Sequence, residues 1–486
     1  MNLLLNLIAH SFILLPFIVL VVQNVLPRRS ARHMCRGLCV ALSAAQIITS
    51  VIAAVIFFSR GVAAFSFGLF SGEEAYLSFD ITSLAIIFCI ALAGLASALV
   101  SFTTENDCRM NYSNLFAVLV LSMNCITLVN DLFSMYVFLE VIGVASFVQI
   151  ALPKDRDAMH LEGAYKYLIL SSLASIFVLA GLAILYLMTG TLNIEELISF
   201  RSDSIVGGDY YLMVFAVLLT AAGFATKAGV APFHGWVPDA YQASSGAVSV
   251  MLAGCVNKAA GAYGLIRIVG LIFTDLPEIN LILALLGLAS ILVGAFSAYR
   301  QTNLKRMLAY SSVSQMGYIL MGICAGPLGV AGAVLHTMNH TIFKSTLFVN
   351  VSAVKSRTNT VNIEELGGLQ SRMPVTGTTS ILAFLSTAGI PPLSGFWSKL
   401  IIIIAVWQNV HPICAGIALF ASILTAVYFL RMQGRVFFGE LKKGLEHIKE
   451  ATANYITCEV FLTAITVGLG IAFPWLLKLL ESSGLI

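Results

Sequence analysis

Apolar runs of about 20 residues, the length that an α-helix needs to cross a bilayer, recur along almost the whole chain. Of the 486 residues, 59% are hydrophobic and only 10% are charged, and no long polar stretch remains for a separate soluble domain. The sequence therefore predicts an all-α polytopic membrane protein, with residues 1–486 as a single membrane domain. The expected spans, about fourteen in number, are 3–26, 38–59, 80–102, 113–130, 132–152, 164–189, 211–230, 245–272, 279–299, 306–325, 328–353, 375–406, 412–431 and 454–478.

Lysines and arginines predict the orientation of these spans, because cytoplasmic loops are enriched in both residues. The odd-numbered loops hold 18 of the 27 basic residues, whereas the even-numbered loops and the C-terminal tail hold four. The 18 are Arg28, Arg29, Arg32, Arg36, Arg109, Lys154, Arg156, Arg300, Lys305, Arg306, Lys355, Arg357, Arg372, Arg431, Arg435, Lys442, Lys443 and Lys449. The four are Arg60, Arg201, Arg267 and Lys478. This asymmetry predicts odd loops in the cytoplasm and both termini outside.

The five remaining basic residues are all lysines, and all of them fall inside expected spans, together with the carboxylate Glu140. The lysines are Lys166, Lys227, Lys258, Lys344 and Lys399. A charge near the bilayer centre costs about 2.5–3.5 kcal/mol even on a lenient scale, so structure alone rarely explains six such groups. A desolvated lysine can release its proton and an arginine cannot, so a set made only of lysines suits a proton relay. Lys166, near the end of its span, equally fits a lysine that extends to the membrane interface.

Two expected spans contain the same helix-breaking pattern. Residues 228–235 read AGVAPFHG and residues 388–395 read AGIPPLSG, and both match AGxxPxxG. Proline removes a backbone donor and clashes with the preceding turn, so Pro232 and Pro392 should break the seventh and twelfth spans. The copies are five spans apart and run in opposite directions, which predicts two inverted repeats, 113–272 and 279–431, each with a discontinuous helix. Lys227 and Lys399 lie beside these breaks, where free carbonyls would supply polar ligands at membrane depth.

Histidines extend this set of titratable residues. His336, His340 and Lys344 follow one another at intervals of four, so they should share one face of the eleventh span. Histidine titrates near neutral pH and can pass protons to a neighbouring amine. His234, in the loop opened by the first break, could relay protons or cap a helix. An HxxxH pair can also hold a metal, but no neighbouring Cys, Asp or Glu completes a site.

Cofactor motifs are absent from the sequence. Neither a GxxxxGK[ST] loop nor a GxGxxG pattern occurs, and the nine cysteines show no CxxC pairing. Most of the cysteines lie inside apolar segments, where the thiol serves as a small hydrophobic group. No cofactor, metal or nucleic-acid partner is therefore expected.

With these residues assembled, the chain resembles the proton-translocating antiporter-like family over roughly residues 75–435. That family includes the large membrane subunits of respiratory complex I, the Mrp-type multisubunit Na⁺/H⁺ antiporters and the membrane-bound hydrogenases. The stretches that carry the resemblance are TKAGVAPFHGWVPDAY, VMLAGCVNKAAGAYGLIRI, NLKRMLAYSSVSQMGYILMGI, HTMNHTIFKSTLF and GIPPLSGFWSKL. The resemblance implies an acid–base couple between Glu140 and Lys227 and a polar axis through Lys258 and the histidine ladder to Lys399. It also implies that the protein lies in a prokaryotic cell membrane, in contact with lipid and with other membrane subunits as partners. The transported ion would be H⁺, with or without Na⁺.

The subfamily rests on finer features. The HxxxHxxxK ladder and a lysine at position 399 are more similar to the D-type subunit of Mrp antiporters and its hydrogenase counterpart than to the middle complex I subunits. A proton-pumping subunit of a complex I-type NADH:quinone oxidoreductase is the alternative. A purely structural membrane subunit and an enzyme acting alone are two further hypotheses. The intact acid–lysine–histidine set opposes the first of these, and the missing cofactor motifs oppose the second.

Overall fold

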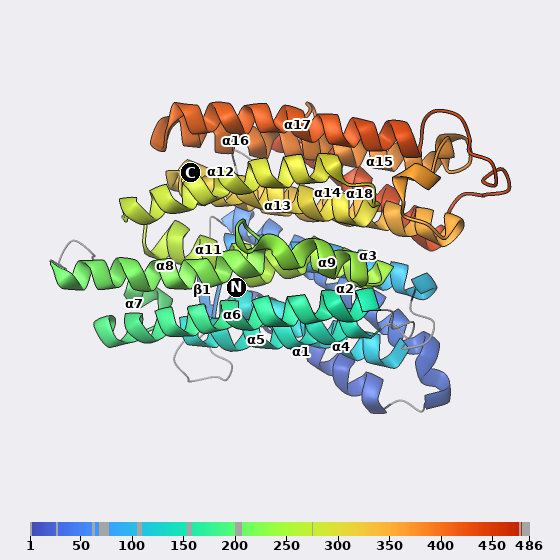
Figure 1. Cartoon of the computed structure of the whole chain (residues 1–486). Coiled ribbons are helices and arrows are strands. Elements are labelled where there is room, and N and C mark those ends of the chain that lie inside the picture. Colours follow the sequence, from blue (N-terminus) through green and yellow to red (C-terminus); the bar gives the residue numbers. More distant parts are fainter. Residues whose placement is uncertain are drawn as a thin grey trace.

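Long helices lying nearly side by side make up almost the whole protein in the computed structural model (Figure 1). The structure describes residues 2–25, 28–60, 64–67, 77–104, 109–152, 158–199, 207–274, 276–475 and 478. One continuous apolar core, reaching from Leu5 to Leu462, joins most of these helices, and a second core contains Ile402 and Val406 of α16. Helices α15, α16 and α17 form the layer at the top of Figure 1, and α5 and α6 lie in the lower part.

The first half of the chain contains nine helices and two strands among its described residues. The helices are α1 (Asn2–Val25), α2 (Arg28–Arg60), α3 (Ile81–Thr104), α4 (Arg109–Leu128), α5 (Leu132–Ala151), α6 (Ala158–Thr189), α7 (Ile194–Ser199), α8 (Gly208–Ala228) and α9 (Trp236–Ala243), with the 3₁₀ turn η2 (Phe233–Gly235) before α9. The strands are β1 (Ala64–Phe67) and β2 (Leu77–Asp80).

The rest of the chain continues with helices, some of them of the π type. One long rod consists of α10 (Gly246–Met251), η3 (Leu252–Val256), η4 (Lys258–Ala262), α11 (Tyr263–Leu265) and η5 (Ile266–Ile272). The helices α12 (Pro277–Arg300), α13 (Leu304–Ile323) and α14 (Gly326–Thr358) follow, and then the turns η6 (Ile363–Glu365) and η7 (Leu369–Ser371). The last helices are α15 (Pro374–Ala388), α16 (Ser394–Asn409), α17 (Pro412–Val436) and α18 (Ala453–Ile471).

The strand pair is a small exception to the all-α prediction. Strands β1 and β2 are antiparallel, with Ala64 opposite Asp80. On β2, Leu77 and Phe79 are buried and alternate with half-buried residues, which is the pattern of a strand with one covered face. Phe79 contacts the rings of Phe12 and Phe57. A strand of four residues is too short to stand out in a hydropathy pattern, so the sequence did not predict it.

Membrane-spanning character is clear in most of the expected spans. Among the described residues, eleven helices are long and apolar enough to cross a membrane. The expected spans 306–325, 328–353 and 375–406 coincide with α13, α14 and the pair α15–α16, which are not among the eleven. Polar residues interrupt α13 and α14, and the other two helices are short, with 15 and 16 residues. The count of fourteen crossings therefore stays a prediction.

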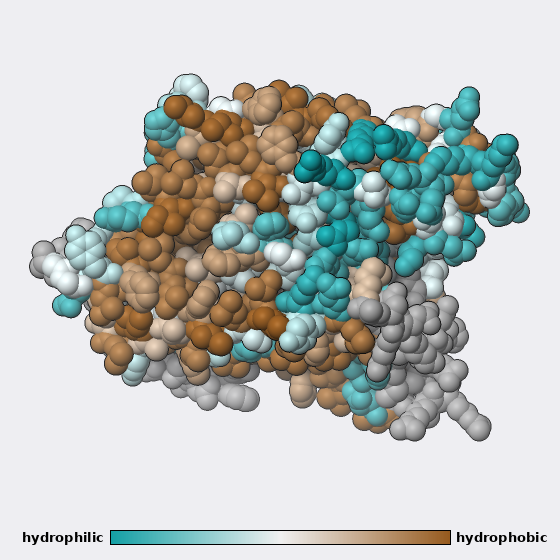
Figure 2. Space-filling model, viewed as in Figure 1, coloured by the Kyte–Doolittle hydropathy of each residue, from teal (hydrophilic) through white to brown (hydrophobic). Residues whose placement is uncertain are grey.

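The surface has the polarity of a multi-pass membrane protein. Figure 2 shows a broad hydrophobic band over the bundle and hydrophilic residues gathered at one end, around the connection between α17 and α18. Large apolar side chains such as Leu187 on α6 and Ile413 on α17 are exposed at 83% and 65%. Exposed apolar surface of this extent is stable only against lipid or another subunit.

The charge count behind the predicted orientation meets three corrections. Arg36, Arg267 and Lys305, counted with the loops, are buried inside the bundle. The reason is local: each has buried polar partners that no hydropathy pattern reveals. Lys154, Arg156 and Arg201 lie outside the described residues, as do the side chains of Arg28, Arg29, Arg32, Arg60 and Arg109.

Candidate functional site

The first predicted helix break is present. Helix α8 ends at Ala228, and Gly229 follows in the left-handed conformation, with φ of 78°. Its N–H donates to the carbonyls of Ala225 and Thr226, which closes the helix end. The indole Nε1 of Trp236, at the start of α9, donates to the Thr226 carbonyl at 2.9 Å. The carbonyls that the break exposes are therefore partly satisfied by the next helix.

The second break has the same construction. Helix α15 ends at Ala388, Gly389 has φ of 82°, and its N–H donates to the carbonyls of Leu385 and Ser386. Helix α16 begins at Ser394. The prediction that proline causes both breaks was incomplete. A glycine in the left-handed region ends each helix three residues before Pro232 or Pro392, because glycine has no Cβ to oppose that conformation.

Lys227, in the last turn of α8, lies between two neighbouring helices. Its Nζ donates to Ser171 Oγ on α6 at 2.7 Å and lies 3.8 Å from Glu140 Oε1 on α5. The lysine side chain is 4% exposed and the glutamate side chain 38%. A Cβ on Gly143 would lie 3.2 Å from the Nζ, so the bare backbone of α5 lets the ammonium group approach. The predicted couple of Glu140 and Lys227 is thus a close ion pair, buried at one end and exposed at the other.

Lys258 lies in the π-helical part of the rod that follows. The side chain is fully buried, and its Nζ donates to the carbonyl of Ala253 five residues earlier. Wide π turns often occur at functional positions because they leave backbone groups free for such contacts. The neighbouring Asn257 directs its Nδ2 toward the carbonyl of Ala228, the last residue of α8, at 3.5 Å. The rod therefore packs directly against the first break.

The histidine ladder on α14 lies inside the bundle. His336 Nδ1 is 2.9 Å from Ser398 Oγ, and its Nε2 is 3.2 Å from Gln315 Oε1. The His340 ring stacks 6.4 Å from the His336 ring, and neither of its nitrogens has a hydrogen-bond partner. One turn further, Lys344 Nζ donates to the Leu308 carbonyl at 2.9 Å and to the Ser311 hydroxyl on α13. The predicted common face of these three residues is confirmed.

Lys399, on α16, uses the second break directly. Its Nζ donates to the Thr387 carbonyl at 2.8 Å, in the last turn of α15, and to Ser422 Oγ on α17 at 3.3 Å. The ammonium group also lies 4.5 Å from the centre of the Tyr318 ring, a favourable cation–π distance. The break thus supplies a carbonyl ligand to Lys399, whereas Lys227 takes a serine hydroxyl from a neighbouring helix.

These buried groups form one connected region. His340 lies within electrostatic range of the ammonium groups of Lys258 and Lys344, and His336 within range of Lys399. Contacts between η4 and α8 bring Lys258 to the segment that carries Lys227. The structure therefore gathers Lys258, Lys344, Lys399 and the two histidines in one polar region of the bundle, and it packs the helix that carries Lys227 against this region.

His234 is the exception. It is half-buried in η2, its Nδ1 has no hydrogen-bond partner, and its ring lies 6.2 Å from the Tyr310 ring. No described contact joins it to the buried lysines. The ring lies within reach of the backbone of Pro232, at the start of η2, but the side chain of Pro232 makes no capping hydrogen bond there.

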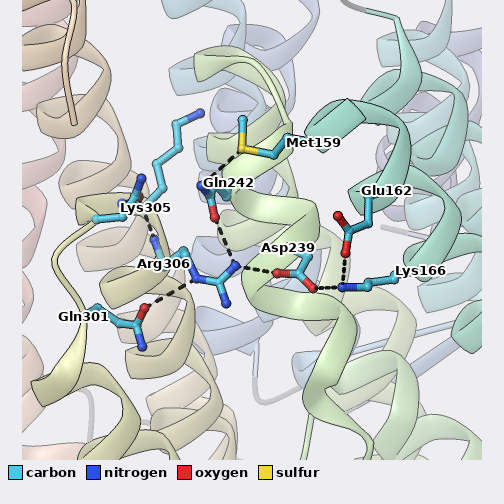
Figure 3. A network of polar contacts seen from close by, with 9 residues as sticks. Met159, Glu162, Lys166, Asp239, Gln242, Gln301, Lys305 and Arg306 are labelled. Carbon is cyan, nitrogen blue, oxygen red and sulfur yellow. Dashed lines mark hydrogen bonds and ion pairs between the residues drawn. The ribbon is translucent and has the colours of Figure 1, made fainter. Parts of the chain in front are cut away.

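Lys166 is a surface residue at the polar end of the bundle, as the interfacial interpretation predicted. Its Nζ lies 2.6 Å from Glu162 Oε1 and 2.7 Å from Asp239 Oδ2, and the side chain is 43% exposed. Arg306, from α13, pairs with the other oxygen of Asp239 and contacts Gln242 (Figure 3). These residues line an open polar cavity of about 330 Å³ where α6, α9 and α13 meet.

Several buried polar residues were not predicted from the sequence. Arg267 pairs with Asp80 at 2.6 Å, and Lys305 donates to the Ser244 carbonyl at 2.6 Å. The set of buried cations is therefore not made of lysines alone. Glu459 is also fully buried; it lies inside the expected span 454–478, so the same search that found Glu140 could have found it. Among the described residues, no group of three or more His, Cys, Asp or Glu side chains is placed to hold a metal.

Gly229→Ala is predicted to destabilise the protein by about 1–2 kcal/mol, because an L-residue resists the left-handed conformation. The added Cβ would also lie 2.6 Å from Val237 Cγ2. Thermal unfolding of the purified protein measures the effect. Gly416→Ala on α17, where a Cβ meets nothing within 4 Å, is the matched control and should keep or slightly raise the parental stability. Pro232→Ala should cost less than Gly229→Ala, and the reverse order would show that proline sets the break.

Comparisons with known proteins agree with this architecture. The family model described as NADH:quinone oxidoreductase/Mrp antiporter, TM, matches residues 129–425. The D-type subunit of the Na(+)/H(+) antiporter of Alkalihalophilus pseudofirmus is 30% identical over 433 residues, which are 88% of this chain and 86% of that protein. The N-type subunit of the NADH-quinone oxidoreductase of Desulforudis audaxviator is 35% identical over 306 residues, 62% of this chain and 60% of that protein.

Two solved structures share the fold. A chain of the Mrp complex from Dietzia sp. DQ12-45-1b has a TM-score of 0.88 at 24% identity, with 98% of this chain and 96% of that chain covered. A chain of the membrane-bound sulfane sulfur reductase, an archaeal respiratory membrane complex, has a TM-score of 0.84 at 26% identity. That match covers 100% of this chain and 97% of the other.

Proposed function

This chain belongs to the family of NADH:quinone oxidoreductase and Mrp antiporter membrane subunits, and from this premise we propose that it translocates protons across a prokaryotic cell membrane. Its place is in a multisubunit Mrp-type cation/proton antiporter or an Mrp-related respiratory or hydrogenase complex. The similarity to a D-type antiporter subunit over 88% of the chain supports the Mrp-type assignment. The alternative is a proton-pumping subunit of a complex I-type oxidoreductase, which the similarity to an N-type subunit supports over a shorter stretch.

One observation carries the proposal: buried amines lie on a connected line with only neutral partners. Lys258, Lys344 and Lys399 contact backbone carbonyls and serine hydroxyls, and none of them forms an ion pair among the described residues. Because no carboxylate holds their charge in place, these amines are suited to exchange protons. A structural role would be served better by apolar side chains of similar volume.

The roles of the residues follow from their positions. Glu140 and Lys227 form the couple at one end. Protonation of the Glu140 carboxylate there changes the electrostatic potential at Lys227. Lys258, His340 and Lys344 continue the line, and His336 connects it to Lys399 at the other end. The unpartnered nitrogens of His340 suit a relay that bonds to water or to a neighbour only during transfer. His234 lies away from this line, and we assign it no step.

Inverted repeats over residues 113–272 and 279–431 are part of the same proposal. The breaks after Ala228 and Ala388 are built alike, each with a left-handed glycine that donates to two carbonyls. We further propose that odd loops face the cytoplasm and both termini face outside, as the distribution of basic residues predicts. Other membrane subunits and lipid would cover the exposed apolar surface and the exposed side of Glu140.

The function is tested on the intact complex. We expect that the purified complex, reconstituted in vesicles, changes the internal pH when a Na⁺ gradient is imposed, and that mass spectrometry finds Mrp-type partner subunits. A NiFe hydrogenase-like partner or a quinone-site partner would select the respiratory alternatives instead. Vesicles that hold the complex yet show no ion-driven or redox-driven pH change would contradict ion translocation.

A further inference from the structure

A second buried acid lies away from the line of lysines, where α18 meets α15. Glu459 on α18 is fully buried, and its Oε2 lies 3.1 Å from Thr376 Oγ1 on α15. The same hydroxyl lies 2.9 Å from Oε1 of Glu450, a half-buried residue in the connection before α18. Glu450 also accepts hydrogen bonds from the N–H groups of Val375 and Ala451. Two carboxyl groups therefore meet at one threonine.

Too few hydrogen-bond donors reach this junction to satisfy two ionised carboxylates. A threonine hydroxyl has one hydrogen and can donate to only one acceptor at a time. Glu450 has further donors from the backbone, whereas Oε1 of Glu459 has no hydrogen-bond partner. Thr379 also lies within hydrogen-bonding reach of Glu459, but its single hydroxyl hydrogen has the carbonyls of Val375 and Thr376 as competing acceptors. If Glu459 carries a proton, it becomes the donor to Thr376, and Thr376 donates onward to Glu450, which satisfies both short contacts at once.

Charges around Glu459 lead to the same conclusion. An isolated buried carboxylate is costly, and a second carboxylate nearby raises the cost. No described Lys, Arg or His side chain forms an ion pair with Glu459. The side chains that meet this stretch from neighbouring elements are Thr103 on α3, Asn350 and Arg357 on α14, and Thr376 and Thr379 on α15. Arg357 lies within electrostatic range of Tyr455, one turn before Glu459 on α18, and forms no ion pair with Glu459.

Asn350 is a second, independent indication that protons are exchanged at this site. Its Nδ2 donates to the Thr376 carbonyl at 3.1 Å, but its Oδ1 has no hydrogen-bond partner, although the residue is 2% exposed. A buried amide oxygen left open beside a carboxyl pair can accept a transient donor such as a water molecule or hydronium. Asn350 is also six residues beyond Lys344 on α14, roughly 9 Å along the helix axis.

We propose that Glu459 holds a proton and exchanges it with Glu450 through the hydroxyl of Thr376, as a proton-loading site at the polar end of the bundle. In the exchange, Glu459 gives its proton to Thr376 Oγ while the threonine hydroxyl proton moves to Glu450, so charge and atoms balance. Glu450, half-buried, is the member that solvent can reach. Given the proposed function, a proton taken up here enters beside α14, the helix that also carries Lys344.

Infrared spectroscopy of the purified, intact complex tests the protonation without any transport. We expect a carbonyl band of a protonated carboxylic acid, shifted in D₂O, that is lost in Glu459→Gln and displaced in Thr376→Val. Glu440→Gln, at an exposed glutamate near the same end, should leave the band unchanged. Glutamine matches the shape and neutrality of a protonated glutamate, so Glu459→Gln should assemble normally.

The outcomes separate this inference from the function itself. An unchanged band in Glu459→Gln would overturn the proposal, and so would a band that disappears when Na⁺ is added, because the site would then bind sodium. In vesicles, Glu459→Gln and Thr376→Val should each lower proton transport about tenfold or more. Parental transport in both variants would remove the loading role. The infrared result stands even if the complex transports nothing.

Discussion

Glu140→Gln is expected to lower ion transport about 100-fold or more, because the amide can neither take up a proton nor offer the charge that faces Lys227. The two groups lie 3.8 Å apart, and the glutamate side chain is 38% exposed. Glutamine therefore fits without rearrangement, and the loss isolates the charge. The measurement is ion-driven pH change in vesicles, scaled to the amount of assembled complex.

Two further variants sharpen this test. Glu140→Asp keeps the carboxylate and shortens its reach, so part of the activity should survive. Glu196→Gln, on the exposed face of α7, removes a carboxylate outside the site and should transport like the parent. If the assembled Glu140→Gln complex transports normally, the couple with Lys227 is not part of the pathway.

Lys399→Arg and Lys227→Arg should each lose most transport, again by about 100-fold, despite normal assembly. Arginine keeps the positive charge but stays protonated at any physiological pH, so it preserves an ion pair and blocks a proton carrier. Lys399 has no carboxylate partner among the described residues and donates to the Thr387 carbonyl and Ser422. It is therefore the cleaner of the two tests.

The result for Lys227→Arg is harder to interpret because little space surrounds this side chain. The Nζ lies close to the backbone of Gly143 and to Ser171, so an arginine there would be crowded as well as permanently charged. Lys227→Gln, which is smaller and neutral, separates these causes and should be equally inactive if proton transfer is lost. Lys355→Arg, at the exposed end of α14, is the matched control and should keep parental rates. Near-parental transport rates for Lys399→Arg and Lys227→Gln would show that these lysines have a structural role and do not carry protons.

Helix positions and both breaks could be predicted from the sequence because they depend on local chemistry. Apolar runs of membrane length leave the backbone no alternative to a helix, and glycine and proline mark the places where its hydrogen bonds stop. The sequence also identified the buried lysines and the histidine ladder, since a charge in an apolar run stands out against its neighbours. Glu459 stood out in the same way and was overlooked.

The hydrogen-bond partners of the buried residues, by contrast, were decided by the tertiary structure. Other helices supply Ser171 to Lys227, Ser398 and Gln315 to His336, and Ser422 to Lys399. Serine is common inside membrane helices, so nothing in its local pattern distinguishes a ligand from a bystander. Arg267 was counted with the loops although it lies inside the expected span 245–272, and its contact with Asp80 shows that it is a buried residue of the bundle.

The sequence by itself determined that this chain forms membrane helices, where two of them break, and that Lys227, Lys258, Lys344 and Lys399 are buried there. Each of these properties is set by residues within a turn or two of one another, where side-chain chemistry and backbone geometry act directly. Only the tertiary structure decided that the buried lysines and the histidine ladder gather in one polar region, that His234 lies apart, and that Glu450 and Glu459 meet at Thr376. Such meetings depend on how whole helices pack, and packing distances do not appear in a linear pattern.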